Sequence, residues 1–244
     1  MSYAPLDIRS HPLDIRSHRS DWAWENFKQV IVDTISERKL ERVAEIGGGR
    51  SPLLSQADVR ALDIESTVID ISAEELTRAP NWVRKITYDI SSAPAITQRY
   101  DFMFSKLVFE HIKDVRSAYK NIYDILDDGG ICINFHPTLY ALPFLINFVL
   151  PTRIAFFILR VFYTSKNSEG RKFPAYYSLC RTNRSVERTL ASIGFRDVRL
   201  YPFYGHGYYK RLPFLHRVQQ RAARFAERHG LTFWSAFCYT VVQK

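Results

Sequence analysis

The stretch VAEIGGGRS, at residues 43–51, decides the fold class of this chain. A short apolar run ends in an acid, Glu45, and continues directly into three glycines at 47–49. Glycines let the backbone approach a ligand closely and adopt φ values that other residues avoid. Ser51 and Pro52 then suit a helix N-cap and first helical position. A strand, a carboxylate, a glycine turn and a helix start together predict a site for a nucleotide-type cofactor.

The acid indicates which cofactor this turn binds. A dinucleotide site directs its glycines and helix N-terminus at a pyrophosphate, which would repel a carboxylate. Glu45 therefore suits a cationic ligand better, and S-adenosylmethionine (SAM) carries an ammonium and a sulfonium group and no phosphate. Pro52 also stands where the dinucleotide fingerprint has its last glycine. Both residues oppose a NAD-dependent oxidoreductase.

The bulk composition sets limits on the protein class. A chain of 244 residues can bury a full core, and its 46% apolar content is ordinary for a globular domain. Its three cysteines are far apart and fit neither a metal site nor a disulfide framework. With no visible signal peptide, this favours a cytoplasmic protein. The net charge of +9 fits nucleic acid, an anionic membrane surface, an anionic substrate, or simply a basic surface.

One segment bears on membrane contact. Residues 139–162 are very apolar, but two prolines and two arginines interrupt them, so no stretch reaches the ~20 apolar residues of a spanning helix. Arg153 and Arg160 are seven residues apart and share one helix face. We interpret the segment as part of a substrate-side insertion, 136–182. It suits an interfacial helix in peripheral membrane contact, the wall of an acceptor pocket, or a cap packed on the core.

The rest of the chain alternates between strand and helix patterns. PLDIRSH occurs at 5–11 and again at 12–18, so residues 1–20 are interpreted as an N-terminal arm with a short duplicated segment. Residues 21–244 then form a single domain. Alternation predicts an α/β fold with a mostly parallel sheet covered by helices on both faces. Strands are expected at 43–46, 67–71, 85–88, 100–105, 131–135, 196–202 and 234–242, and helices at 21–42, from 72, at 114–126 and at 212–229.

Polar residues recur where these expected strands end. Asp70 lies 23 residues after the first glycine, near the spacing at which an acid accepts hydrogen bonds from ribose hydroxyls. Asp89 follows the third strand and suits the adenine amino group, whereas Ser105 ends the fourth. Because the carboxyl ends of parallel strands share one edge, these residues should converge with Glu45 on one crevice.

Motifs throughout this half of the chain resemble those of class I SAM-dependent methyltransferases. They are VAEIGGGRS, VIDIS, YDI and YDFMFSKLVFEHIKDVRSAYKNIYDILDDGGICINF, spread over residues 43–135. The resemblance implies a Rossmann-like seven-stranded sheet whose last strand is antiparallel. Ser51 stands in place of a third glycine, and DDGG replaces the commoner KPGG. The insertion and GHGYY at 205–209 are similar to bacterial glycan and natural-product methyltransferases. The resemblance implies SAM as the cofactor, bound by Glu45, Gly47, Gly48, Gly49, Asp70, Ile71, Asp89, Ile90, Ser105 and Lys106.

Methyl transfer to a neutral hydroxyl needs a base, and histidine suits that role near neutral pH. We expect His136 to be the base, because it should follow the fifth strand at the cofactor edge. His206 is the second candidate, in an aromatic loop flanked by glycines. His111 is the third, although it suits a brace for its turn equally well.

The leading hypothesis is O-methylation of a small or lipid-linked acceptor, such as a sugar hydroxyl on a glycolipid. One alternative is an RNA methyltransferase. It is less favoured because SKLV stands where amine methylation of bases commonly has an Asn/Asp-Pro-Pro-aromatic turn. Another is a SAM-binding or partner-binding protein without catalysis. The sequence indicates no oligomeric state.

Overall fold

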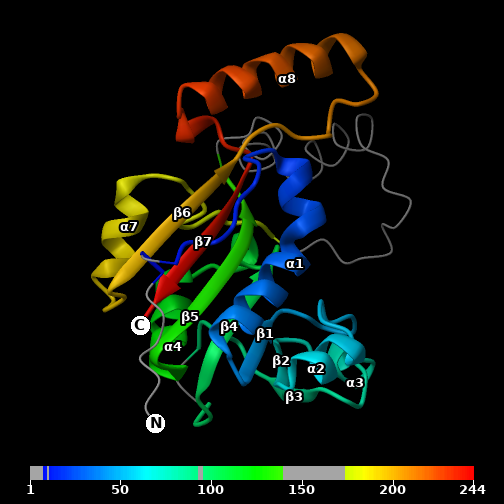
Figure 1. The fold of residues 1–244 in the computed structure, drawn as a ribbon, viewed down its shortest axis with the longest axis vertical. Coiled ribbons are helices and arrows are strands. Elements are labelled where there is room, and N and C mark those ends of the chain that lie inside the picture. Colours follow the sequence, from blue (N-terminus) through cyan, green and yellow to red (C-terminus); the bar gives the residue numbers. More distant parts are fainter. Residues whose placement is uncertain (1–7, 10, 93–95, 140–173) are drawn as a thin grey trace.

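The computed structural model describes residues 8–9, 11–92, 96–139 and 174–244. Within them the chain forms one seven-stranded sheet in the order β3-β2-β1-β4-β5-β7-β6 (Figure 1). This order and the helices beside it confirm the expected Rossmann-like α/β fold. The strands are β1 (Arg42–Ile46), β2 (Glu65–Asp70), β3 (Arg84–Thr87), β4 (Tyr100–Lys106), β5 (Leu126–Pro137), β6 (Asp197–Phe203) and β7 (Phe237–Gln243).

The strand directions bring the expected site residues to one edge. Strands β1 to β5 are mutually parallel, and β7 inserts antiparallel between β5 and β6. The last strand is therefore antiparallel, as expected. The carboxyl ends of β1, β2, β3, β4, β5 and β6 share one edge with the start of β7, and ligands of such sheets bind at that edge.

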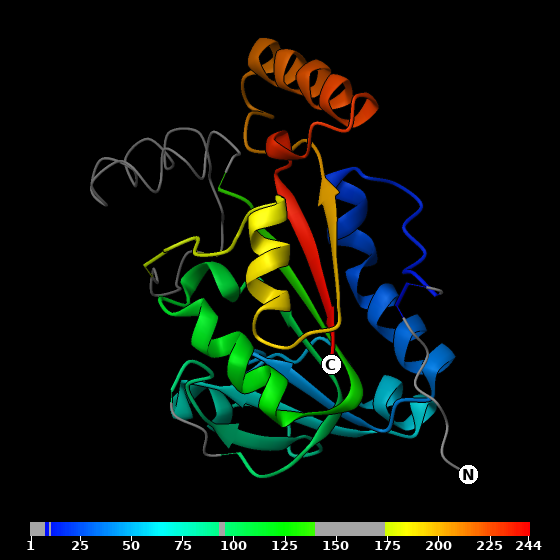
Figure 2. The same cartoon turned by 90° about the vertical axis from the view of Figure 1, so that its left-hand side faces the viewer.

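Helices cover both faces of the sheet (Figure 2). On one face, α1 inserts Phe27 and Ile31 against aromatic rings of β5 and β7. On the other, α4 packs Tyr119 and Ile122, and α7 packs Val186 against the sheet. The helices are α1 (Ser20–Arg38), α2 (Gln56–Leu62), α3 (Ala73–Thr77), α4 (Val115–Ile125), α7 (Arg184–Ala191) and α8 (Pro213–Arg228), with 3₁₀ turns η1 (Phe109–His111) and η2 (Thr232–Trp234).

The described residues of the N-terminal arm lie along the outer strand β6. The Ile8 N–H donates to the Gln243 side chain, the Leu13 N–H to the Tyr201 hydroxyl, and the Tyr204 N–H to the His18 carbonyl. The arm thereby covers an edge strand whose backbone groups would otherwise be open to pairing with another chain.

The structure corrects several expected element boundaries, and those nearest the site are as follows. Helix α2 does not begin at Ser51 and Pro52 but at Gln56, because Ser55 forms a reciprocal capping box with Asp58. The glycines of DDGG do not end α4. They lie at an irregularity in the pairing of β4 with β5, and β5 itself runs through His136 to Pro137. His136 therefore lies inside a strand and not after it.

Most of the expected insertion lies outside the described residues. This includes 140–173, and with it both arginines and nearly all of the apolar segment 139–162. In the described part of the chain, no helix combines the length and apolar character needed to cross a membrane.

Asn134 of β5 connects β4 and α4 on the face of the sheet that α4 covers. It is fully buried, its Oδ1 accepts from the Ser105 hydroxyl at 2.8 Å, and its Nδ2 donates to the Tyr119 hydroxyl at 3.2 Å. Asn134→Ala should lower the free energy of unfolding by about 2–3 kcal/mol, because buried partners lose their hydrogen bonds. Urea unfolding measures this loss, with Asn81→Ala, at an exposed turn, as the control. Equal midpoints for the two variants would contradict it.

Candidate functional site

The glycine turn follows β1 directly and has little room for side chains. Gly47 has φ +75° and donates its N–H to the Ile69 carbonyl at 2.7 Å, which ties the turn to the neighbouring strand. A Cβ on Gly48 would lie 2.8 Å from Cδ of Glu45. Gly49 has φ +50°, and a Cβ there would lie 3.4 Å from a carboxylate oxygen of Asp70. The turn therefore passes closely between two acids, and the left-handed φ values at Gly47 and Gly49 favour glycine.

Glu45 is buried beneath this turn. Its Oε2 accepts the N–H of Leu53 at 2.8 Å. Burial raises the pKa of the Glu45 carboxyl to about 7, although the Leu53 N–H and the charge of Lys106 oppose the rise. A carboxylate that is costly to ionise gains most from a cationic ligand, because the ligand restores the charge that burial disfavours.

Asp70 ends β2 and faces the turn from the side. One carboxylate oxygen accepts the N–H of Ser72 at 2.8 Å, whereas the other lies against Gly49. Ile71, the next residue, is 66% exposed although it is apolar. A hydrogen-bond acceptor beside an exposed aliphatic surface matches a ribose attached to a flat base.

The next strand end carries Asp89 and Ile90. Asp89 accepts hydrogen bonds from both the N–H and the hydroxyl of Ser91, at 2.9 and 2.7 Å. Burial would raise the pKa of Asp89, but these bonds outweigh it and hold the pKa below its ordinary value. Asp89 is therefore an ionised acceptor. Ile90 is buried, and its carbonyl accepts from Asn121 at 2.8 Å, which anchors the loop to α4.

The end of β4 carries Ser105 and Lys106, which differ in what they can contact. The Ser105 side chain is buried and donates to Asn134, so only its backbone lies at the edge. The Lys106 ammonium lies over the Trp24 ring, 5.1 Å from its centroid, and over Phe27 at 5.9 Å. Burial lowers the pKa of Lys106, and Glu45 partly offsets this.

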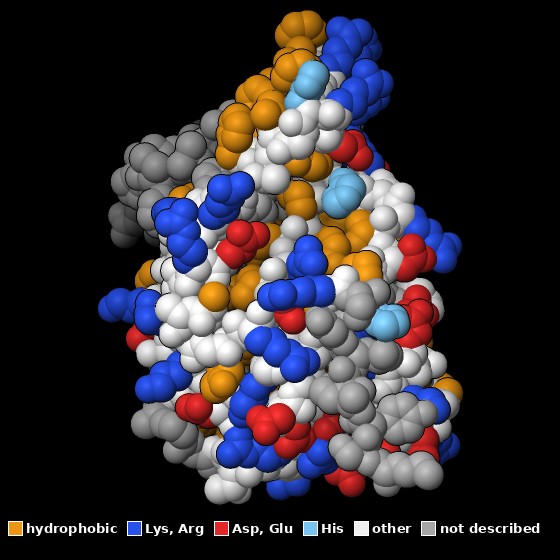
Figure 3. All heavy atoms as spheres, turned by 60° about the vertical axis from the view of Figure 1, so that its left-hand side comes forward, with side chains coloured by type: hydrophobic (Ala, Val, Ile, Leu, Met, Phe, Trp, Pro, Cys, Tyr) orange, Lys and Arg blue, Asp and Glu red, His pale blue; other side chains and the backbone are white. Residues whose placement is uncertain are grey.

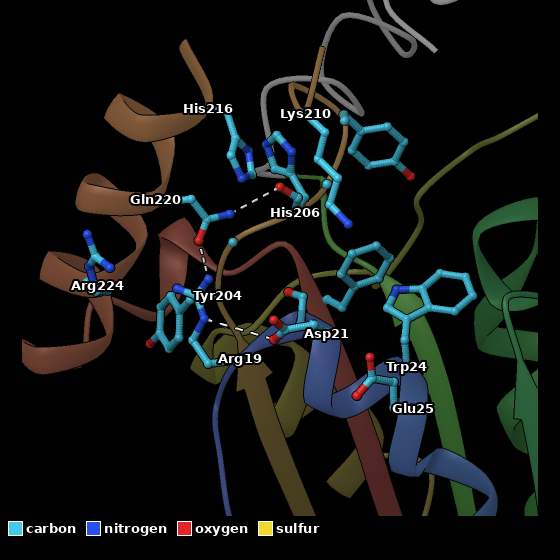
Figure 4. Close-up of a pocket in the computed structure, with 15 residues that line it drawn as sticks. Arg19, Asp21, Trp24, Glu25, Tyr204, His206, Lys210, His216, Gln220 and Arg224 are labelled. Atoms are coloured by element: carbon cyan, nitrogen blue, oxygen red, sulfur yellow. Dashed lines mark hydrogen bonds and ion pairs between the residues drawn. The ribbon is translucent and has the colours of Figure 1, made fainter. Parts of the chain in front are cut away.

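A pocket of about 600 Å³ opens between the start of α1, the residues that follow β6, and α8 (Figure 4). Its wall combines aromatic rings with charged groups of both signs. Trp24 lines it and also contacts Phe237, at 5.6 Å between ring centroids. The other lining side chains include Arg19, Asp21, Glu25, Tyr204, His206, Tyr208, Lys210, His216, Gln220 and Arg224.

Several buried polar atoms of this pocket have no hydrogen-bond partner within the described residues. They are one guanidinium nitrogen of Arg19, the Ser20 hydroxyl, and Nδ1 of both His206 and His216. The walls themselves are fixed, since Gln220 on α8 accepts from Arg19 and donates to the His206 carbonyl (Figure 4). Buried polar groups without partners are costly, so a rigid pocket with several of them is suited to a polar ligand.

His206 is the titratable group most changed by this pocket. Burial, followed by the neighbouring His216, lowers the pKa of the His206 imidazole to about 4. The ring is therefore neutral at pH 7 and can accept a proton. It packs against Tyr208 and Tyr209 at centroid distances of 5.3 and 4.9 Å.

The glycine turn and the pocket are connected through one cation. Lys106 interacts electrostatically with Glu45 on one side and lies over Trp24 on the other, and Trp24 lines the pocket. The edge of the sheet thus holds a carboxylate-flanked turn and an aromatic, polar pocket side by side.

Comparisons with known proteins agree with this geometry. A family model described as a methyltransferase domain matches residues 44–134, which include the glycine turn and the ends of β1 to β4. The chain carries a class I SAM-dependent methyltransferase domain. No curated protein matches the chain by sequence.

Solved structures of methyltransferases share the fold. A SAM-dependent methyltransferase from Archaeoglobus fulgidus is 16% identical, with a TM-score of 0.53, and the match covers 92% of this chain and 100% of that one. One from Listeria monocytogenes is 17% identical, with a TM-score of 0.53 and coverages of 92% and 97%. The plantazolicin methyltransferase, in complex with S-adenosylhomocysteine, is 14% identical, with a TM-score of 0.52 and coverages of 92% and 83%. At these identities the likeness shows the fold alone.

The glycine turn of this methyltransferase fits SAM. Without side chains at 47–49 a ligand can approach the backbone closely, and the buried Glu45 suits the cationic methionine end. Asp70 and the exposed Ile71 suit the adenosine. When bound, SAM supplies a methyl group made electrophilic by the sulfonium.

His136 is not among the residues that line the pocket between α1 and α8. It is fully buried in β5, its Nδ1 donates to the Pro137 carbonyl at 3.1 Å, and its Nε2 accepts from the Thr240 hydroxyl at 2.8 Å. Burial lowers its pKa to about 4. Both ring nitrogens are thus engaged, so its role as a base stays a prediction that this geometry does not favour.

His111 lies in η1, and its Nδ1 donates to the Pro174 carbonyl at 2.9 Å, which braces the turn. Its neighbour Glu110, which the sequence analysis missed, is buried, and burial raises the pKa of that carboxyl to about 8. Most pocket residues were also missed, including Arg19, Trp24 and Gln220. A cluster of polar residues and tryptophans at the start of α1, SDWAWEN, is the one local signal that could have indicated them.

The raised pKa of Glu45 makes SAM binding depend on pH. The ionised carboxylate binds the cation, so affinity should be full above pH 7 and fall about tenfold per unit below it. Glu45→Gln should weaken binding at pH 8 and flatten this dependence. Isothermal titration between pH 5.5 and 8.5 measures both effects.

Glu65→Gln is the matched control, because Glu65 is exposed at the opposite end of β2. It should reproduce the unmodified profile, including any contribution from the SAM amino group. If Glu45→Gln shows that same profile, Glu45 does not bind the methionine end.

Proposed function

We propose that this methyltransferase O-methylates a hydroxyl of a small or lipid-linked acceptor, such as a sugar, bound in the pocket between α1 and α8. The observation that carries the proposal is the contact of Lys106 with Trp24, which joins the cofactor turn to that pocket. A volume of about 600 Å³ is typical of a small-molecule site.

The lining of the pocket supports a polar acceptor with flat apolar faces. Trp24 and Tyr204 offer aromatic surfaces of the kind that pack against sugar rings. Asp21 and Glu25 can accept hydrogen bonds from hydroxyls, and the unpartnered Arg19 nitrogen can donate one. Lys210 and Arg224 add positive charge, which suits an acceptor that also carries an anionic group.

The reaction is an in-line displacement. The acceptor oxygen forms a bond to the methyl carbon while the bond from that carbon to sulfur breaks, and S-adenosylhomocysteine leaves. The hydroxyl proton must then go to a base. His206 is the proposed base, because its ring is neutral at pH 7 and its Nδ1 is unpartnered in the pocket. A protonated ether is a strong acid, so even an imidazole of low pKa takes this proton.

Enzyme function here depends mainly on holding two reactants in line. Positioning alone can remove roughly 7–11 kcal/mol of a barrier in ideal cases. The Arg19–Gln220–His206 chain of hydrogen bonds fixes the pocket wall between two elements distant in sequence. Membrane contact through 139–162 also stays a proposal, and residues 140–162 of that segment lie outside the described residues.

The acceptor class is tested with methyl-labelled SAM. The purified protein is incubated with a cell extract, and labelled products are separated and identified by mass spectrometry. A labelled glycan or glycolipid supports the proposal. Labelled RNA, or SAM binding with no labelled product from any fraction, contradicts it.

Replacing His206 tests its role as the base. His206→Ala should lower turnover by roughly 10²–10⁴-fold and leave SAM affinity nearly unchanged. Because the pKa of His206 is about 4, titration of this ring should leave turnover of the unmodified enzyme level from pH 8 to pH 5. Below pH 5 the ring becomes protonated and turnover should fall. Initial rates at saturating SAM measure this.

His136→Ala is the matched comparison. It removes the bond to Thr240 in β7 and should lower the thermal midpoint of unfolding, while turnover per folded molecule changes far less. Loss of turnover in His136→Ala with full activity in His206→Ala would reverse the two roles.

A further inference from the structure

Helix α8 projects from the body of the molecule beside the acceptor pocket (Figures 1 and 2). Its contacts with the rest of the protein are small. It buries only Ala223 and Ala226, which pack with Tyr204 and Leu231. His216 and Gln220, on the same side, line the pocket.

The outward side of α8 is unusually apolar. Phe214, Val218 and Phe225 are 79%, 46% and 52% exposed. Their spacing of four and seven residues places them on one helix face. A helix at the surface of a globular protein normally buries its large apolar residues and exposes its polar ones. Here alanine and glutamine face the body while phenylalanine faces outward, and the one ring contact of the outward face within the described residues is that of Phe225 with His229 at the end of the same helix.

A stripe of arginines runs along the same helix. Arg217, Arg221, Arg224 and Arg228 follow a spacing of four, three and four residues. Arg221 is seven residues from Phe214, so the arginine and apolar stripes adjoin. Figure 3 shows apolar side chains along one side of the projecting helix and arginines along the other. Residues 210–228 hold six Lys and Arg but one acid.

We infer that the outward face of α8 docks on the surface of an anionic lipid bilayer. A helix with one apolar and one cationic stripe lies in the interface plane, with its apolar side chains at the acyl boundary and its cations at lipid phosphates. The following turn, η2, exposes Phe233 and Trp234, and tryptophan is enriched at such interfaces.

Charge complementarity favours this occupant over others. A second copy of the chain would bring two arginine stripes together, and these would repel each other. Nucleic acid would neutralise the arginines but leave Phe214 and Phe225 exposed to water. An anionic bilayer matches both stripes at once.

Docking through α8 would also place the pocket at the bilayer. Arg224 belongs to the arginine stripe and lines the pocket, together with His216 and Gln220 of the same helix. The inference stands whether or not the acceptor is lipid-linked, because its test involves lipid alone. If the protein proves not to O-methylate such an acceptor, the inference about lipid docking is unaffected. If α8 does not bind lipid, the proposed function is likewise unaffected.

Vesicle sedimentation tests the inference. The full chain should bind vesicles of phosphatidylcholine and phosphatidylglycerol, and bind phosphatidylcholine alone at least tenfold more weakly. Phe214→Ser with Phe225→Ser should weaken binding to the anionic vesicles about tenfold or more. Arg217→Gln, Arg221→Gln and Arg228→Gln together should weaken it roughly 100-fold. None of these five residues lines the pocket.

The net charge of the chain needs its own control. Arg60→Gln, Arg184→Gln and Arg188→Gln remove three exposed arginines from α2 and α7, so the charge change is the same. This variant should keep most of the binding, and SAM titration confirms that every variant is folded. Equal losses in both arginine variants would overturn the inference. A concentration-dependent dimer that is lost in the Phe214→Ser, Phe225→Ser variant would also overturn it. RNA binding that is lost in this variant, with no binding to lipid, would overturn it as well.

Discussion

The burial of one carboxylate beneath the glycine turn is the constraint on which the cofactor site depends. Glu45 is the penultimate residue of β1, and its Oε2 accepts the N–H of Leu53, which holds the chain beyond the turn back against the strand. Helix α2 begins beyond this bond, at Gln56, where Ser55 caps it. Gly48 passes so close to the Glu45 side chain that any Cβ would collide. The acid thus shapes the turn that binds the ligand. A bound cation offsets the free-energy cost of ionising this buried carboxyl.

Lys106 extends this constraint to the other half of the molecule. It comes from β4, next to β1, and it partly compensates the buried Glu45. Its ammonium also lies over the ring of Trp24, and Trp24 lines the pocket proposed to hold the acceptor. A substitution at Glu45 or at Trp24 should therefore also change the surroundings of the other residue through Lys106. This coupling suits an enzyme whose main contribution is relative placement of two substrates.

The sequence predicted strands β1 to β4 well because the information that specifies them is local. Short apolar runs, each followed within a residue or two by Glu45, Asp70 or Asp89, define strands and strand ends without knowledge of the fold. The acceptor half depends on contacts between distant segments. Arg19 and Gln220 are 201 positions apart, and no periodicity in either segment indicates that they meet. His136 shows a third case: two further residues of strand pairing turn a residue expected after β5 into one buried within it.

Helix α8 shows how the same physics separates packing from function. A helix that served only to cover the pocket would bury Phe214, Val218 and Phe225 and turn its alanines outward, because burial of large apolar side chains stabilises the fold. The observed orientation forgoes that stabilisation. The residues that do face the body, His216 and Gln220, shape the pocket, and Gln220 connects to Arg19 and His206. One helix therefore carries pocket-lining residues on its inner side and an amphipathic face on its outer side. Anything bound by the outer face would lie within about a helix diameter of the pocket proposed to hold the acceptor.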